Sequence, residues 1–355
     1  MTGSREPRLL IVGGLSIDTI TDATGDTQLA VPGGNAIYAA IGARMWGVSP
    51  RVVGLVGDDY PSAWLDELSQ AGIDATGVQR VPGPHQNRFA VRYRADGERE
   101  PHVPATAFAA AGLPLPAVLE RMAELLSTDG NTWRTNDETR TVAWRTRPDA
   151  VPPDIRDADA CLIVPAALDR QIEWVAATLD WLPADAPVLL DPEEEQGRVL
   201  TTTDLQSVLT GVDVVMPSLR QIAGLLVGQS LTGAARLLTS LGPRIAAIKL
   251  GADGCLVYDA AGDWERRISP VPTEVRDTTG AGDAFCGGFA AGYLRTHDAF
   301  EAALFGTVSA SYAIEGYGAF AGLPSDPAEA QHRLQSLRAR SIQATSPAKQ
   351  EGLSG

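Results

Sequence analysis

The most informative stretch of this chain is Asp277-Thr278-Thr279-Gly280-Ala281-Gly282-Asp283-Ala284-Phe285. Residues 271–275 before it form a short extended run, and residues 285–294 after it carry apolar side chains at helical spacing. The stretch therefore predicts a strand, a tight glycine loop and a helix. Such a loop directs several backbone N–H groups and the positive end of a helix at one point, which makes a site for an anion.

A carboxylate, Asp283, falls in the first turn of the predicted helix. An anion site beside a general base is the arrangement that phosphoryl or acyl transfer needs. The same residues would also suit an ordinary helix start, in which Asp283 only interacts with the helix dipole.

The full string resembles the C-terminal signature of the ribokinase-like (PfkB) family of sugar and nucleoside kinases. The resemblance implies that Asp283 is the catalytic base, and that Gly280, Ala281 and Gly282 form the anion hole for the ATP phosphates. It also implies that Thr278 contacts the nucleotide and that Asp277 lies at a site for a monovalent cation such as K⁺.

Composition narrows the classes of function. The chain has 355 residues, of which 44% are hydrophobic, and its net charge of −15 argues against a broad nucleic-acid-binding surface. Only two lysines occur, Lys249 and Lys349, and there is no P-loop string. The three cysteines lie in apolar runs, and the four histidines lack metal-ligand spacing. Because no signal peptide or membrane-spanning run is found, we expect a cytoplasmic protein.

The N-terminal part carries the predicted acceptor site. Asp18 follows a predicted buried strand, near the carboxyl end where open α/β sheets bind ligands. Asp18 could accept two hydrogen bonds from a polyol, or it could stabilise a turn. Gly33, Gly34 and Asn35 open a predicted helix and resemble the family's sugar-contacting Gly-Gly motif. Tyr38, however, occupies the position at which ribokinase-type members usually have Asn. This difference argues against the prediction that the acceptor is simply ribose.

Two hairpins are predicted outside the main sheet, near residues 19–31 and 88–103. In relatives such strands form a lid over the sugar and often a dimer contact, so the resemblance implies a homodimer through the lid. Residues 104–153 are interpreted as an insertion near the lid or as a disordered surface loop. We expect one kinase domain over residues 8–325, followed over residues 326–355 by a surface helix at 326–340 and a disordered tail at 341–355.

From residue 159 onward, strand and helix patterns alternate. Strands are predicted at residues 160–164, 188–190, 212–216, 245–250 and 255–258, and helices at residues 168–181, 219–227 and 231–241. This alternation predicts an α/β fold with a doubly wound, mostly parallel sheet, as the ribokinase-like resemblance implies. The helix after Asp283 contains three glycines, which we expect to pack closely against the sheet.

Further residues are assigned to the nucleotide through the resemblance. They are Lys249, Gly251 and Gly254 in a Leu-Gly-x-x-Gly turn, Gly318 and Ala319 nearer the C-terminus, and Ser218. The family has Asn-x-x-Glu, which holds Mg²⁺ largely through water, where this chain has Ser218 and Gln221. Because both replacements are neutral, we expect weaker Mg²⁺ binding, metal held chiefly by ATP, or lost activity. Ser218 could also serve only as a helix N-cap.

The sequence thus predicts an ATP-dependent kinase that phosphorylates a hydroxyl of a small-molecule sugar, polyol or nucleoside, with Mg²⁺ and K⁺ as cofactors. The alternative is a non-catalytic sensor or assembly protein that keeps the fold and binds nucleotide or sugar without turnover. The Ser218 and Gln221 replacements favour that alternative. A dinucleotide oxidoreductase is disfavoured, because Gly13-Gly14 has no following glycine at the Rossmann spacing.

Overall fold

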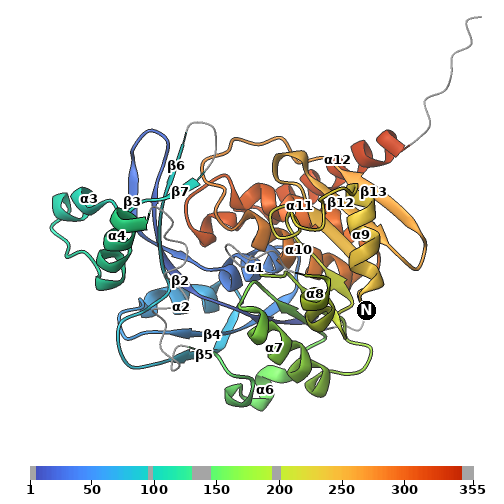
Figure 1. The fold of residues 1–355 in the computed structure, drawn as a ribbon, viewed down its shortest axis with the longest axis horizontal. Helices are drawn as coiled ribbons and strands as arrows, with labels where there is room; N and C mark the ends of the chain where they lie inside the picture. The colour runs from blue at the N-terminus through green and yellow to red at the C-terminus, as the bar shows by residue number, and fades with distance from the viewer. Residues whose placement is uncertain (1–4, 95–98, 130–144, 194–200, 346–355) are drawn as a thin grey trace, which may run out of the picture.

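The computed structural model describes residues 5–94, 99–129, 145–193 and 201–345. Within these residues, nine strands form the main sheet and four strands form a small sheet. The main sheet lies between two layers of helices, and the small sheet stands at one end of the molecule (Figure 1). The predicted α/β architecture with a small additional sheet is confirmed.

The strands of the main sheet follow a doubly wound order. From one edge to the other they are β13 (Trp264–Ile268), β12 (Cys255–Asp259), β11 (Ile245–Lys249), β10 (Val214–Val215), β9 (Val188–Leu190), β8 (Ala160–Ile163), β1 (Arg8–Val12), β4 (Ser49–Val56) and β5 (Asp74–Arg80). The pairs β11–β12 and β12–β13 are antiparallel, and the other pairs are parallel. The chain first extends the sheet from β1 to β4 and β5, and later adds β8 on the other side of β1. A topological switch point therefore lies between β1 and β8.

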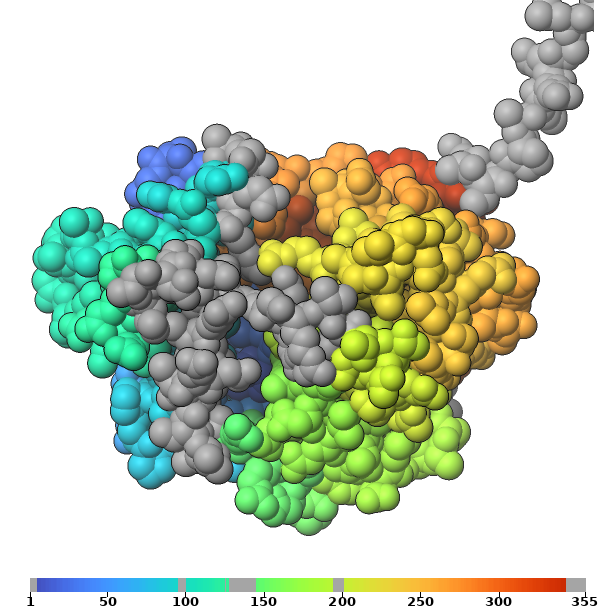
Figure 2. All heavy atoms as spheres, viewed as in Figure 1, coloured from blue at the N-terminus to red at the C-terminus, as the bar shows by residue number. Residues whose placement is uncertain are grey.

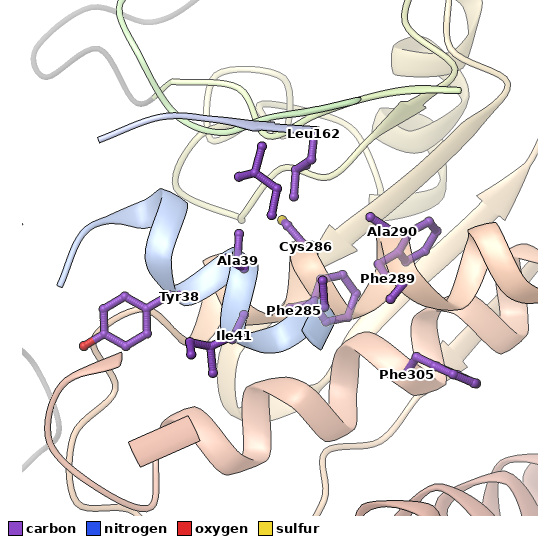
Figure 3. Close-up of a cluster of buried hydrophobic side chains, with 14 of the residues drawn as sticks. Tyr38, Ala39, Ile41, Leu162, Phe285, Cys286, Phe289, Ala290 and Phe305 are labelled. Carbon is purple, nitrogen blue, oxygen red and sulfur yellow. The ribbon is translucent and has the colours of Figure 1, made fainter. Parts of the chain in front are cut away.

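Two layers of helices bury the apolar faces of this sheet. One layer consists of α1 (Asn35–Arg44), α2 (Ser62–Gln70), α10 (Ala281–Thr296), α11 (Ala299–Ala313) and α12 (Pro327–Thr345). The other consists of α6 (Pro153–Arg156), α7 (Leu168–Trp181), α8 (Thr202–Leu209) and α9 (Leu231–Ser240). Figure 3 shows part of the first layer, where α1, carrying Ala39 and Ile41, lies beside α10, carrying Phe285 and Phe289. None of the described helices combines the length and apolar character that a membrane crossing requires.

The small sheet consists of two hairpins joined by a parallel pair. Its strands, in spatial order, are β3 (Thr27–Gly33), β2 (Ser16–Thr21), β6 (Arg88–Tyr93) and β7 (Arg99–Pro101). Both predicted hairpins are therefore present. Two helices, α3 (Ala105–Ala110) and α4 (Ala117–Asp129), pack on this sheet through Phe108, Leu119 and Met122. They belong to the predicted insertion, of which residues 130–144 lie outside the described residues.

Two predicted elements are replaced by irregular backbone. Residues 219–227 form consecutive turns rather than a helix. Gly224, in the middle of the segment, lowers its helix propensity, and several of its hydrogen bonds span three residues, as from Leu225 N to Ile222 O (2.8 Å). Residues 271–275 join no sheet. Pro272 within that segment has no N–H to donate to a ladder.

The sequence analysis also misjudged the C-terminus and missed some elements. The predicted disordered tail begins too early, because α12 continues to Thr345 and buries Ser341 against the core. Residues 346–355 of that tail lie outside the described residues. The strands β5 and β13 and the helix α8 were not predicted. β5 and β13 carry mostly half-buried or exposed residues, which weakens their apolar signal.

The glycines of α10 contact neighbouring helices rather than the sheet. A Cβ at Gly287 would lie 1.8 Å from the carbonyl oxygen of Ala39 on α1, and a Cβ at Gly42 would lie 2.3 Å from that of Ala284. Gly288 approaches α11 in the same way. The prediction that these glycines pack against the sheet was therefore wrong. They pack against α1 and α11, because these two helices flank α10 within one layer.

We predict that Gly287→Ala lowers the free energy of unfolding by about 1–3 kcal/mol, the usual cost of overpacking. Neither backbone can yield without moving a whole helix. The matched control is Gly233→Ala in α9, where the nearest atom to a new Cβ is the flexible side-chain oxygen of Gln229 at 3.2 Å. Helix propensity should make that control neutral or more stable by up to about 1 kcal/mol. Denaturant titrations that rank the two variants equally would contradict the packing argument.

Candidate active site

The predicted site residues gather at the carboxyl ends of the parallel strands. Asn35 accepts a hydrogen bond from Gly14 N–H (2.8 Å) and donates one to Pro165 O (2.8 Å). Because Gly14 follows β1 and Pro165 follows β8, this amide spans the topological switch point, where α/β proteins bind ligands. In Figure 2 the molecule is hollowed here, with dark blue atoms of the N-terminal part visible beside the green segment that follows β8.

The glycine loop has the local geometry of an anion site. Gly280 precedes α10 with a φ of 73°, in the left-handed region that favours glycine. A Cβ there would also lie 2.1 Å from the ring of Tyr38, so only glycine lets the loop approach α1 this closely. No described side chain caps α10, and Asp283 lies in its first turn, the part of a helix where backbone N–H groups commonly bind anions. Thr278 O accepts from Ala281 N–H (3.3 Å), which closes the loop.

The small sheet reaches this loop by hydrogen bonds. The hydroxyl of Tyr93, on β6, lies 2.6 Å from Oγ1 of Thr279. Thr279 N–H donates to Oδ1 of the buried Asp277 (2.8 Å). At the far end of β2, Tyr317 donates to Asp22 (2.9 Å). The position of the small sheet is therefore coupled to that of the glycine loop.

A buried ion pair lies beside the same loop. Lys249, at the end of β11, pairs with Asp191, which follows β9, and their side chains are only 11% and 2% exposed. Cys286 Sγ lies 3.4 Å from Lys249 Nζ and from Asp191 Oδ2. A Cβ at Gly282 would lie 3.5 Å from Lys249 Nζ. Burial opposes the charge on Lys249, but the carboxylates of Asp191 and Asp283 help to raise its pKa above the ordinary value, so the ammonium group persists.

Ser218 and Gln221 form a reciprocal turn next to this ion pair. Ser218 N–H donates to Oε1 of Gln221, and Gln221 N–H donates to Oγ of Ser218 (3.4 Å). The side-chain amide of Gln221 donates to Oδ1 of Asp191 (3.1 Å) and to Pro192 O. Both ends of this amide are therefore engaged, and a carboxylate in its place could not make the two donated bonds.

The residues around Gln221 offer few ligands to a divalent cation. No group of three metal-ligating side chains occurs in the part of the chain that the structure describes. Asp191, the carboxylate that Gln221 contacts, is already paired with Lys249. This donor set fits a Mg²⁺ ion that arrives with nucleotide phosphates better than one held in a protein cage.

On the acceptor side, Asp18 lies on β2 against the glycine pair. Ser16 donates to its Oδ1 (2.5 Å), and a Cβ at Gly33 would lie 1.9 Å from its Oδ2. Gly34 has a φ of 102°, and a Cβ there would lie 2.4 Å from Gly14 O. The structure thus brings together the residues predicted for the acceptor, and Asp18 is nearly fully buried among them.

The remaining nucleotide assignments fall in two places. Gly251 and Gly254 form the turn from β11 to β12, directly after Lys249. Gly318 and Ala319 lie instead beside the small sheet, where a Cβ at Gly318 would be 3.1 Å from a side chain of β3. The structure therefore separates these two pairs rather than joining them.

Sequence reasoning assigned no role to four residues that the structure places around the site. They are Asp191, Cys286, Tyr60 and Tyr93. Asp191 carried a usable signal, since it ends a predicted strand just before a proline. The tyrosines carried none, because they reach the site from the small sheet and from the turn after β4.

Comparison with known proteins supports one class for this geometry. The family described as pfkB family carbohydrate kinase matches residues 161–326. A cytidine kinase from Thermococcus kodakarensis is 26% identical over 311 residues, which cover 87% of this chain and 97% of the relative. An uncharacterized sugar kinase from Archaeoglobus fulgidus is 40% identical over 121 residues, which cover 34% of this chain and 47% of the relative.

Solved structures share the fold. The Arabidopsis thaliana ribokinase complexed with ribose and ATP has a TM-score of 0.66 at 20% identity, covering 93% of this chain and 99% of that one. The Burkholderia thailandensis nucleoside kinase in complex with inosine has a TM-score of 0.66 at 16% identity, with the same coverage. The architecture is therefore that of the ribokinase-like kinases. Over residues 161–326 the chain is similar to the pfkB family carbohydrate kinases, and its relatives include a cytidine kinase and a sugar kinase.

We predict that Gln221→Glu lowers the melting temperature in the absence of Mg²⁺. The change removes two donated hydrogen bonds and places a second carboxylate beside Asp191, and an unsatisfied buried group costs about 1–3 kcal/mol. Added Mg²⁺ should raise the melting temperature of this variant more than that of the wild type, because a cation relieves the repulsion. The control, Gln206→Glu on the exposed face of α8, should show neither effect. A metal-free variant as stable as the wild type would contradict this account of Gln221.

Proposed function

We propose that this kinase transfers the γ-phosphoryl group of ATP to a hydroxyl of a sugar, polyol or nucleoside, with Asp283 as the general base. The observation that carries the proposal is the convergence of Asp283, the uncapped start of α10 and the Lys249 ammonium group at one place. After the larger effect of burial, the charges of both Asp18 and Asp283 raise the pKa of Tyr38. The acceptor carboxylate and the proposed base therefore act on one pocket.

The proposed chemistry assigns a distinct task to each group. Asp283 accepts the proton of the attacking hydroxyl as the phosphoryl group is transferred. The first-turn N–H groups of α10, over Gly280, Ala281 and Gly282, stabilise the negative charge that the transferred group carries. Lys249 adds a fixed positive charge beneath the loop, and its pairing with Asp191 holds that charge in place.

The residues proposed to contact the nucleotide come from four segments. They are Ser218, Lys249, Gly251, Gly254, Thr278, Gly318 and Ala319. Mg²⁺ bound with ATP would supply neutralisation of the phosphate charge. We propose that Gln221 contacts this ion through water, and that Asp277, buried behind Thr279, serves a monovalent cation such as K⁺.

We propose further that residues 8–325 act as one kinase domain and that the small sheet is its lid. The bonds of Tyr93 to Thr279 and of Tyr317 to Asp22 support a lid whose closure is linked to the glycine loop. The helices α3 and α4 cover one face of this sheet. A homodimer contact through the lid would therefore use the edge of the sheet rather than that face.

One observation favours a second candidate, a non-catalytic protein that binds nucleotide or sugar without turnover. Gln221 stands where the family has a carboxylate, and its amide is engaged by Ser218 and Asp191. Formation of ADP from Mg²⁺-ATP in the presence of cytidine, D-ribose, D-fructose or myo-inositol decides between the candidates. Turnover with any of them supports the kinase, and binding without turnover supports the second candidate.

Asp283→Asn should reduce turnover by about 10²–10⁴ while nearly preserving the binding of ATP and acceptor, because only the proton acceptor is lost. Turnover is measured as ADP formation, and binding as the shift in melting temperature. Asp66→Asn, a change at an exposed site on α2, is the control and should keep wild-type rates. If Asp283→Asn retained most of the wild-type kcat, the assignment of the base would be wrong.

Asp18→Ala should weaken acceptor binding and leave the KM for ATP unchanged. A charged hydrogen bond to a hydroxyl contributes about 1.5–3 kcal/mol, so the KM for the acceptor should rise about tenfold or more. Initial rates measured while varying each substrate in turn separate the two effects. A rise in the KM for ATP with an unchanged KM for the acceptor would mean that Asp18 lies at the nucleotide site and not at the acceptor site.

A further inference from the structure

Three buried tyrosine hydroxyls have no hydrogen-bond partner among the residues that the structure describes, and two of them lie near the proposed acceptor site. These two belong to Tyr38, which is 2% exposed, and to Tyr60, which is 1% exposed. A buried phenol normally finds a partner, because an unpaired O–H away from water is costly. Two such hydroxyls beside the proposed acceptor site indicate a ligand that supplies the missing partners.

Tyr38 is held between the glycine pair and the glycine loop. Its backbone N–H donates to Gly34 O (3.1 Å), and its ring lies against Gly280, where a Cβ would be 2.1 Å away. Gly33, which precedes Gly34, touches Asp18. Figure 3 shows the ring turned away from the hydrophobic cluster, with the hydroxyl at its outer end. The ring is therefore fixed by packing, while its O–H is left for another group.

Tyr60 is held in a similar way from the turn after β4. Its ring packs edge-on against Trp64, with ring centroids 5.3 Å apart, and against His85, with centroids 4.9 Å apart. Arg80 donates two hydrogen bonds to its backbone carbonyl, both 3.2 Å long. The hydroxyl is again the part of the residue that the described contacts do not use.

His85 connects Tyr60 to the strand that carries Asp18. Its Nδ1 accepts from Gly57 N–H (3.2 Å), so Nε2 bears the proton and donates to Leu15 O (3.1 Å). Burial lowers the pKa of His85 to about 4, which keeps this neutral form at physiological pH. Leu15 leads directly into β2, and both tyrosines lie close enough to Asp18 for its charge to raise their pKa.

The electrostatics make both phenols donors. Burial, followed by the charge of Asp18, raises the pKa of Tyr60, and the same two causes act on Tyr38 together with Asp277 and other neighbours. Both phenols therefore keep their protons at neutral pH. The region combines a carboxylate, which only accepts hydrogen bonds, with two hydroxyls that can donate them.

We propose that Tyr38 and Tyr60 are specificity-determining donors of the acceptor site and that, together with Asp18, they recognise a vicinal diol. Each hydroxyl of such a diol can donate to Asp18 and accept from one phenol. Each oxygen of a carboxylate such as Asp18, to which Ser16 already donates, can accept more than one hydrogen bond. The inference rests on the proposed function and adds the chemical class of the acceptor. A monodeoxy analogue would leave one phenol unpaired and is therefore disfavoured.

The test compares Tyr38→Phe and Tyr60→Phe with the matched control Tyr312→Phe in the full chain. Tyr312 also buries a hydroxyl without a partner among the described residues, but its ring lies against Arg333, 3.9 Å from the ring centroid. Neither site variant should lower the melting temperature, because neither loses an internal hydrogen bond. Each should weaken diol binding about 2- to 10-fold, with the KM for ATP unchanged. The control should change neither quantity.

The probes are cytidine, D-ribose, D-fructose and myo-inositol, each beside a monodeoxy analogue such as 2′-deoxycytidine. Binding is measured as the shift in melting temperature without ATP, and turnover as ADP formation. The wild type should prefer the diol, and this preference should shrink in both site variants. Binding of the diol without turnover would contradict the proposed function but would still support the diol site. The inference is overturned if no diol binds, if the analogue binds equally well, or if either site variant is destabilised.

Discussion

The close contact between α1 and α10 is the constraint on which the rest of the site depends. Gly287 meets the backbone of Ala39, and Gly42 meets that of Ala284, so the two helices touch without intervening side chains. This contact places the start of α1, with its glycine pair, next to the start of α10, with its glycine loop. The groups proposed to hold the acceptor and those proposed to hold the phosphates therefore lie on two helices whose separation is set by glycine.

In the proposed function, local charge rather than the net charge of the molecule would hold an anionic nucleotide. The chain carries a net charge of −15, which would repel ATP at long range. Two local features oppose this repulsion. They are the N-terminal dipole of α10 and the buried Lys249, whose ammonium group is paired with Asp191. Because these groups are shielded from water, they act strongly over the short distances at which a phosphate would bind.

The residues proposed to bind the acceptor rely on hydrogen bonding and packing rather than on a helix dipole. Asp18, on β2 of the small sheet, is nearly fully buried, accepts a hydrogen bond from Ser16 and lies against Gly33. The small sheet then joins this side to the phosphate side through Tyr93 and Thr279. A kinase must exclude water between donor and acceptor, and a sheet bonded to the phosphate loop is suited to that task.

Sequence alone determined the alternation of strands and helices, both hairpins of the small sheet and the glycine loop before Asp283, because these depend on local periodicity and turn chemistry. It failed at residues 219–227 and 271–275, where a central glycine and a proline override the apolar pattern. Only the tertiary structure decided that Lys249 pairs with Asp191, that α10 packs on helices, and that Tyr60 lies near Asp18. These contacts join segments far apart in the chain, and their energy comes from burial and close packing, which no local pattern encodes.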